Sequence, residues 1–271
     1  MIRDTLKKVI PFPLAVKIRG GWQKMLRLVY SGQTYYCPYC DNNFRKFLRG
    51  GYPNPLAEEK KIVGAGVRPN MLCPRCYSTD RDRLIYLYLK EKTDVFVRPT
   101  GILHIAPAGS VKHLLESLPN VEYETGDKFE DGYRGYYYDR DVTQLDVTAL
   151  PYADDSFDMV LCNHVLEHVP EDLKAMSEIR RVLKKGGQAL LQVPVSLLLD
   201  KTDEGSADTP EERERRFGQF DHVRLYALDY KQRLEKAGFT VEVHNPERDG
   251  WGQEIERLAV NPLEDVYVAV K

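Results

Sequence analysis

Residues 157–195 decide the fold class of this 271-residue chain, and they read FDMVLCNHVLEHVPEDLKAMSEIRRVLKKGGQALLQVPV. The run FDMVLC (157–162) is short and continuously apolar, which predicts a strand buried on both faces. A proline at the start, acidic residues in the first turn and Lys-Lys-Gly-Gly at the end predict a helix over 170–185. The run QALLQVPV predicts the next strand, over 188–195. A strand, a helix and a strand in this order indicate part of a parallel sheet.

Strands and helices alternate on both sides of this stretch, which is typical of a parallel sheet covered on both faces. Further helices are expected over 111–118 and 227–237. The polar stretch from about 196 to 222 has no apolar periodicity and favours an inserted lid. We therefore predict an α/β domain over 100–271, with its other strands at 101–106, 121–127, near 137–146, 239–245 and 265–271.

Composition places the chain among soluble globular proteins, since 42% of the residues are hydrophobic and 30% are charged. No apolar run approaches the roughly 18–20 residues of a membrane span, and the N-terminus lacks the continuous apolar core of a signal peptide. A cytoplasmic protein is expected.

The formal net charge of −2 hides an asymmetry. Residues 1–98 carry 19 Lys and Arg against 8 Asp and Glu, a net of +11, and the rest carry 20 against 33, a net of −13. The basic part would suit an anionic partner such as RNA or phospholipid head groups, and the two parts would equally attract each other. Residues 1–30 form a basic, partly helical lead with Trp22, Met25, Leu26 and Val29 at helical spacing. This lead predicts either peripheral membrane contact or packing on the protein itself.

Four of the five cysteines form two Cys-x-x-Cys pairs, Cys37 with Cys40 and Cys73 with Cys76. Two such pairs complete a tetrahedral four-sulfur site, so we predict a zinc-ribbon-like module over 31–80 with a structural zinc. Glycines and prolines between the pairs suit two short hairpins. A redox role for Cys-Pro-Tyr-Cys and two structural disulfides are the alternatives, but the βαβ setting and the export signal that they need are missing. A linker helix is expected within 81–99.

The stretch from Asp146 to Val195 closely resembles the type-11 group of class I S-adenosylmethionine-dependent methyltransferases. The motifs that carry the resemblance are acid-x-x-x-Leu-Pro-aromatic, Asp-x-Ser-Phe-Asp, His-Val-Leu-Glu-His-Val and Arg-Val-Leu-Lys-x-Gly-Gly. The resemblance covers roughly residues 100–271. It implies a Rossmann-like seven-stranded sheet whose last strand is antiparallel, S-adenosylmethionine as cofactor, and methyl transfer.

Ligands of open α/β sheets bind beyond the carboxyl ends of the strands. Asp127 ends the second strand, where a carboxylate can accept from both ribose hydroxyls, although a plain turn aspartate is the alternative. The resemblance places Asp146 and Val147 against the adenine, and Asn163 and His164 toward the cofactor.

The loop after the first strand departs from the family's Asp-x-Gly-x-Gly-x-Gly. His104 replaces the acid that would hold the methionine ammonium, and backbone approach falls to Ala106, Ala108 and Gly109. Binding through altered contacts is expected, with a pseudoenzyme as the alternative.

A hydroxyl or amine acceptor gains from a positioned base, and histidine titrates in the right range. The candidates are His164, His168 and His222, of which His168 and His222 are favoured, with Asp221 orienting a ring. Packing or helix-capping histidines are the alternative for each. We predict a methyltransferase acting on a small molecule or sugar of a glycan pathway, with the tyrosine-rich run 133–138 as a stacking surface. An RNA methyltransferase using the basic zinc module and a cofactor-free binding protein are the alternatives.

Overall fold

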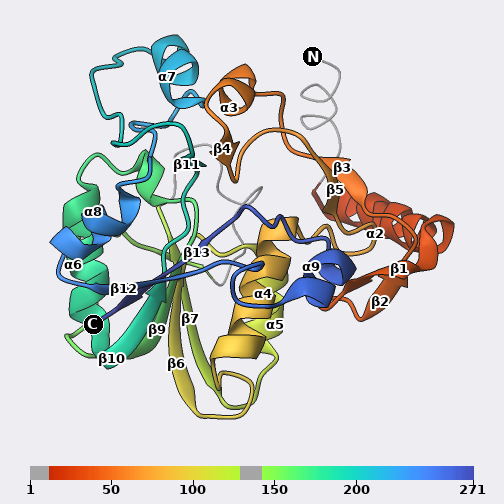
Figure 1. Ribbon diagram of the computed structural model, residues 1–271. Helices are drawn as coiled ribbons and strands as arrows, with labels where there is room; N and C mark the ends of the chain where they lie inside the picture. The colour runs from red at the N-terminus through yellow and green to blue at the C-terminus, as the bar shows by residue number, and fades with distance from the viewer. Residues whose placement is uncertain (1–11, 129–141) are drawn as a thin grey trace.

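The computed structural model describes residues 12–128 and 142–271, and its body is a seven-stranded sheet (Figure 1). The strand order is β12-β13-β10-β9-β6-β7-β8. From β10 to β8 the neighbouring strands are parallel, whereas β13 is antiparallel to both β10 and β12. The predicted fold class, with an antiparallel last strand, is confirmed. The strands are β6 (Thr100–Ile105), β7 (Val121–Asp127), β8 (Thr143–Gln144), β9 (Phe157–Cys162), β10 (Leu183–Leu190), β12 (Thr240–His244) and β13 (Val266–Val270).

Helices cover both faces of the sheet (Figure 1). On one face lie α4 (Asp80–Lys92), α5 (Gly109–Glu116) and α9 (Gly252–Leu258), and on the other α6 (Asp172–Val182) and α8 (Tyr230–Lys236). Each face of the sheet has its own hydrophobic core, and successive residues of β6 point to opposite faces. Ile102 packs in the core with α4 and α5, and Leu103 in the core with α6 and α8. Each fully buried aliphatic side chain of this kind contributes about 1.5–3 kcal/mol.

The helix predicted over 170–185 ends earlier, at Val182, and the next strand begins at Leu183 rather than at 188. Leu183 is fully buried and pairs with Phe157 of β9, so burial of this side chain draws the backbone into the sheet before the glycines. Gly186, at φ +76°, lies inside the irregular start of β10 instead of capping a helix. Helix α9 has no counterpart among the predicted elements.

The N-terminal part contains α2 (Phe12–Val29), the hairpin of β1 (Ser31–Cys37) with β2 (Asn42–Phe44), and the pair of β3 (Leu48–Gly50) with β5 (Arg68–Leu72). Each strand pair leads into one cysteine pair. Residues 54–63, with α3 (Pro55–Glu59) and β4 (Ile62–Val63), differ from the predicted second hairpin. This segment runs away from the cysteines and packs on the predicted lid. Its strand β4 pairs with β11 (Val195–Ser196), and Ile62 is buried together with Phe217 of α7 (Pro210–Phe217).

The predicted domain boundaries, at 1–30, 31–80, 81–99 and 100–271, stay predictions, and so do the predicted partners. Helix α2 exposes Trp22, Met25 and Val29 and buries Leu26, so the predicted membrane contact stays open to test. Among the residues described, none of the helices combines the length and apolar character needed to cross a bilayer. The tyrosine-rich run 133–138 and most of the strand expected near 137–146 lie outside the described residues.

Candidate functional site

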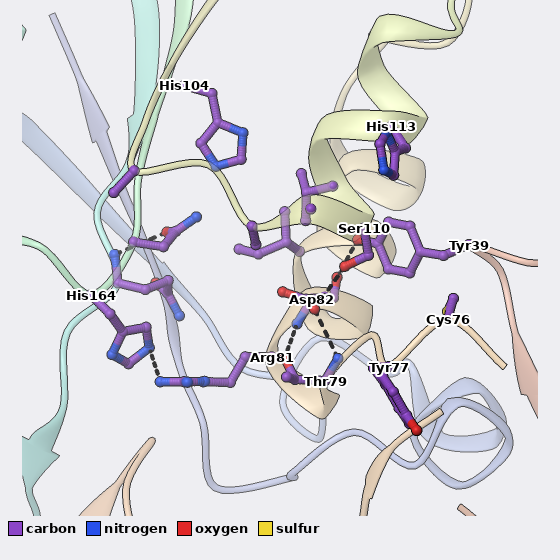
Figure 2. Close-up of a pocket in the computed structure, with 17 residues that line it drawn as sticks. Tyr39, Cys76, Tyr77, Thr79, Arg81, Asp82, His104, Ser110, His113 and His164 are labelled. Carbon is purple, nitrogen blue, oxygen red and sulfur yellow. Dashed lines mark hydrogen bonds between the residues drawn. The ribbon is translucent and has the colours of Figure 1, made fainter. Parts of the chain in front are cut away.

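A cavity of about 470 Å³ opens at the carboxyl ends of β6 and β9 (Figure 2). Its walls come from the loop after β6 with the start of α5, from the segments after β9 and β10, and from the start of α4 together with both cysteine pairs. Of the predicted cofactor and catalytic residues, six line the cavity: His104, Ala106, Ala108, Gly109, Asn163 and His164.

Three non-glycine residues on the cavity wall have left-handed backbones: Tyr77 (φ +60°), Ala106 (φ +50°) and His164 (φ +58°). This conformation is uncommon for residues with a Cβ atom, and it persists only where surrounding contacts enforce it. Two of those contacts are backbone hydrogen bonds, from Ala106 N to Gly126 O at 2.8 Å and from His164 N to Gln192 O at 2.7 Å. Because the backbone of Ala106 is left-handed, a conformation that glycine adopts without a steric cost, a glycine would suit this position of the loop.

His104 is a neutral group in this structure. It is 1% exposed, its Nδ1 lies 2.7 Å from the Tyr123 hydroxyl, and burial lowers its pKa to about 3. A neutral imidazole does not supply the negative charge of the acid that it replaces. A carboxylate on the cavity wall therefore has to be sought at another residue.

Asp82, from the first turn of α4, places a carboxyl group on that wall (Figure 2). Its Oδ2 accepts hydrogen bonds from Ser110 Oγ and Thr79 N, both at 2.8 Å. Burial raises the pKa of Asp82, although these hydrogen bonds oppose the shift. A cation in the cavity would therefore be especially favourable beside this carboxyl group.

Arg81 precedes Asp82 and donates from Nη1 to His164 Nε2 at 2.7 Å (Figure 2) and to Gly64 O at 3.1 Å. Because a guanidinium only donates, His164 Nε2 must accept, and the ring proton lies on Nδ1. Burial, together with the Arg81 charge, lowers the pKa of His164 to about 4. In this arrangement the Nε2 lone pair of His164 is occupied by Arg81.

Asp127, Asp146 and Val147 are not among the residues that line this cavity. Asp127 is half-buried at the end of β7, burial raises its pKa, and its Oδ1 accepts from Lys128 N at 2.7 Å. Asp146 is exposed, and its Oδ1 accepts from Thr148 N and Oγ1, both at 2.8 Å. Val147 is buried in the core with α6. Their roles toward a ribose and an adenine stay predictions.

His168 and His222 lie in a second cluster rather than on the cavity wall. Their ring centroids are 4.7 Å apart, and the rings stand at 84°. Asp221, predicted to orient a ring of the adjacent His222, faces His168 instead: its Oδ2 lies 3.3 Å from His168 Nδ1. Their function as bases stays a prediction.

The four predicted metal ligands come together. Cys37 Sγ lies 3.6 Å from Cys76 Sγ, and Cys40 Sγ lies 3.7 Å from Cys73 Sγ. A tetrahedral ion with Zn–S bonds of about 2.3 Å would hold sulfurs about 3.8 Å apart. A disulfide would need about 2.05 Å. The donor set and its spacing therefore fit zinc and do not fit disulfides.

Sequence reasoning missed the part of the cavity wall contributed from outside the sheet. These residues are Tyr39, Tyr77, Thr79, Arg81 and Asp82; Ser110 at the start of α5 and Gln192 after β10 were missed as well. The available signal was the alternating run Arg81-Asp82-Arg83 at the start of a helix, charges that a helix serving only as a linker does not need.

Parts of this chain are similar to known proteins. Residues 124–191 match the family described as methyltransferase domain. An uncharacterized protein of Methanocaldococcus jannaschii is 54% identical over 44 residues, 16% of this chain and 19% of that protein. A demethylmenaquinone methyltransferase of Bacillus velezensis is 51% identical over 41 residues, 15% of this chain and 18% of that enzyme. The chain thus spans about a fifth of the length of these curated relatives.

Among solved structures, a SAM-dependent methyltransferase from Archaeoglobus fulgidus covers 70% of this chain and 94% of its own, with 16% identity and a TM-score of 0.43.

Proposed function

We propose that this protein is an S-adenosylmethionine-dependent methyltransferase. The observation that carries the proposal is the cavity at the carboxyl ends of β6 and β9, in a sheet whose strands β8 to β10, with the end of β7, lie within the stretch that matches methyltransferase domains. Parallel α/β sheets bind nucleotide cofactors at this edge. A volume of about 470 Å³ lies within the usual range for small-ligand sites, about 300–1,000 Å³.

The charges on the cavity wall suit the amino-acid end of this cofactor. An ammonium group would be held by Asp82, and a carboxylate by Arg81, since the two side chains offer the complementary charges. Asp127 would accept from the ribose hydroxyls. The cofactor itself supplies a methyl group on a sulfonium, so the protein's part is to align the acceptor and exclude water.

The acceptor we propose is a small molecule or a sugar of a glycan pathway. Support comes from two aromatic side chains of the cavity wall, Tyr39 and Tyr77, which lie at the two cysteine pairs. Aromatic faces of this kind suit a sugar ring.

We also propose that Cys37, Cys40, Cys73 and Cys76 hold a structural zinc ion. The Sγ separations support this assignment. Four thiolates fill the tetrahedral shell, so the ion would hold the chain rather than take part in the reaction.

The test is calorimetric titration of the full chain with S-adenosylhomocysteine. We expect saturable one-to-one binding by the wild type and a loss of at least about tenfold in affinity for Asp82→Asn and for Asp127→Ala, because each removes a charge-assisted hydrogen bond. Asp94→Asn, an exposed carboxylate paired with Arg98, is the matched control and should bind as the wild type does. Absence of heat and of thermal shift with the wild type would overturn the proposal in favour of a binding protein that keeps the fold.

A further inference from the structure

We propose that Glu167, His168 and His222 bind a divalent transition-metal ion, such as Zn²⁺, Fe²⁺ or Mn²⁺, at a site separate from the four cysteines. One ligand atom from each of the three side chains lies within 4.8 Å of the other two. Two imidazoles and one carboxylate form a ligand set that these ions accept and that leaves coordination positions open. The inference does not depend on the proposed methyl transfer.

Glu167 contributes a buried oxygen that lacks a partner. The residue is 2% exposed and lies in the short 3-10 helix η1 (Leu166–His168), directly after β9. Its Oε1 is 3.4 Å from His164 Nδ1, whereas its Oε2 has no hydrogen-bond partner among the described residues. An unsatisfied buried oxygen costs about 1–3 kcal/mol. Such an atom in a native structure points to a water or an ion at its side.

Both imidazoles are oriented as metal ligands are. His222 Nδ1 lies 3.3 Å from Phe217 O, and because a carbonyl only accepts, Nδ1 carries the proton and Nε2 the lone pair. His168 Nδ1 faces the Asp221 carboxylate at 3.3 Å in the same manner. Metal-binding histidines almost always donate the other ring N–H to a carboxylate or a backbone carbonyl. Each ring thus has this outer partner already in place.

The backbones that carry the three side chains are fixed to each other. Val223 N donates to Glu167 O at 2.9 Å, and the buried Arg224 donates to Leu166 O at 2.9 Å and to Pro170 O at 2.8 Å. The segment that bears His222 is therefore tied to η1. Adjacent ligand atoms on an ion at about 2.0–2.2 Å stand about 3 Å apart, so small side-chain rotations suffice to close the site on an ion.

The open coordination positions face outward. The side chains of Glu167 and His222 are buried, but that of His168 is 31% exposed. An oxygen ligand, either water or a hydroxyl of an acceptor molecule, fits this side of the ion. In this arrangement Nε2 of His168 and of His222 holds the ion instead of taking a proton from the acceptor.

The experiment is titration of the full, zinc-loaded chain with Co²⁺, followed by visible spectroscopy. We expect one further equivalent to bind with weak visible bands and without the thiolate charge-transfer band that marks cobalt at cysteines. Glu167→Gln and His168→Ala should each weaken this binding at least tenfold. His244→Ala is the matched control, because His244 also faces a carboxylate, Asp249 at 2.6 Å, but lies outside the cluster. It should bind cobalt as the wild type does.

Asp221→Asn keeps all three ligands and weakens only the outer partner of His168. We expect it to lower cobalt affinity about ten- to hundredfold with an unchanged circular dichroism spectrum. The proposal is overturned if the wild type shows no saturable cobalt binding beyond the thiolate site. It is equally overturned if both ligand variants bind as the wild type does. Should the ligand variants fail to fold, an unchanged affinity in Asp221→Asn decides against it.

Discussion

Glu264 is 5% exposed, and its Oε2 has no hydrogen-bond partner among the described residues. Burial raises its pKa from the ordinary 4.5 to about 7. The folded protein therefore binds a proton that the unfolded chain releases between these two pH values. Stability contributed by the protonated group is complete below pH 4.5 and is lost as the pH rises through 7.

Glu264→Gln should remove this pH dependence. Between about pH 5 and pH 8, the wild type should lose about 3 kcal/mol of unfolding free energy relative to the variant, since each pKa unit corresponds to 1.36 kcal/mol. Urea unfolding across this range measures the difference. Glu122→Gln, at an exposed position of β7, is the control and should follow the wild type. Parallel curves for wild type and Glu264→Gln would contradict the prediction.

Among the individual residues of the cavity wall, the sequence predicted those that follow the strands and missed those that come from α4. His104 and Asn163 stand directly after or within recognisable strands, so the carboxyl-edge rule finds them. Arg81 and Asp82 begin a helix whose apolar spacing predicts only that it packs. No local pattern tells which edge of the sheet the start of that helix reaches.

Among the elements, α3 and α7 are joined through one side chain. Asn54 accepts from Ala57 N at 3.1 Å, which caps α3, and donates to Gly218 O at 3.0 Å, at the end of α7. Gly218 has φ +88°, and a Cβ atom there would lie 2.8 Å from Asn54 Nδ2. The lack of a side chain at Gly218 thus permits both the left-handed turn that ends α7 and the close contact with Asn54 of the α3 cap.

Gly218→Ala should destabilise the protein more than Gly250→Ala. Both positions have positive φ and share the penalty of about 1 kcal/mol for a left-handed alanine, but Gly250 has no atom within 4 Å of an added Cβ. The difference, about 1 kcal/mol for a displaced cap, should appear in the unfolding free energy measured in urea. Equal losses would show that Asn54 moves aside without consequence.

The first cysteine pair contacts α4 next to the cavity. Tyr39, between Cys37 and Cys40, donates its hydroxyl to Asp82 O at 2.5 Å, and its ring lies edge-on to Tyr86 of α4. The first cysteine pair therefore supports the first turn of α4, and Cys76 of the second pair lines the cavity.

Cys40→Ser should weaken S-adenosylhomocysteine binding by about tenfold, because loosening of Tyr39 reduces the preorganisation of Asp82. Calorimetry on the variant measures the loss. Arg75→Ala, which changes the second cysteine pair without removing a ligand, should bind as the wild type does. Unchanged affinity in Cys40→Ser would show that the cysteine site and the cavity are independent.

Element prediction succeeded where burial and propensity agree. The strands at 121–127 and 157–162 have the predicted bounds. It was wrong at the end of α6, where the Lys-Lys-Gly-Gly signal was overridden by the pairing of Leu183 with Phe157. It also missed the course of residues 54–63, because their strand partner, Val195–Ser196, is far away in the sequence.

Over the whole molecule, the N-terminal residues are joined to the sheet at several distant points. β4 pairs with β11, Arg257 lies 4.8 Å from the centroid of the Tyr36 ring, and Lys92 lies 3.6 Å from Asp249. In the second contact a cation of the C-terminal part, Arg257, lies over an N-terminal ring. In the third, Lys92 of α4 lies beside a carboxylate of the C-terminal part. Unfolding of the cysteine module should therefore involve the sheet as well.

Removal of the proposed zinc should lower the melting temperature of the whole chain. A 1 kcal/mol loss corresponds to a shift of about 2–4 °C for a domain of this size, and a structural zinc contributes several times that amount. Differential scanning calorimetry with and without a chelator should show one transition that moves downward. A separate low-temperature transition, with the main one unmoved, would contradict the cooperative behaviour.

Arg83 has no exposed surface, and its guanidinium donates to carbonyl groups from both ends of the chain: Ser78, Asn70 and Met71 on one side, Leu258 and Ala259 on the other. A ribosome delivers the N-terminal acceptors long before the C-terminal ones. Arg83 therefore completes its contacts only after Leu258 and Ala259 have been synthesised, so the final packing of α4 against the N-terminal residues waits for this later part of the sheet domain.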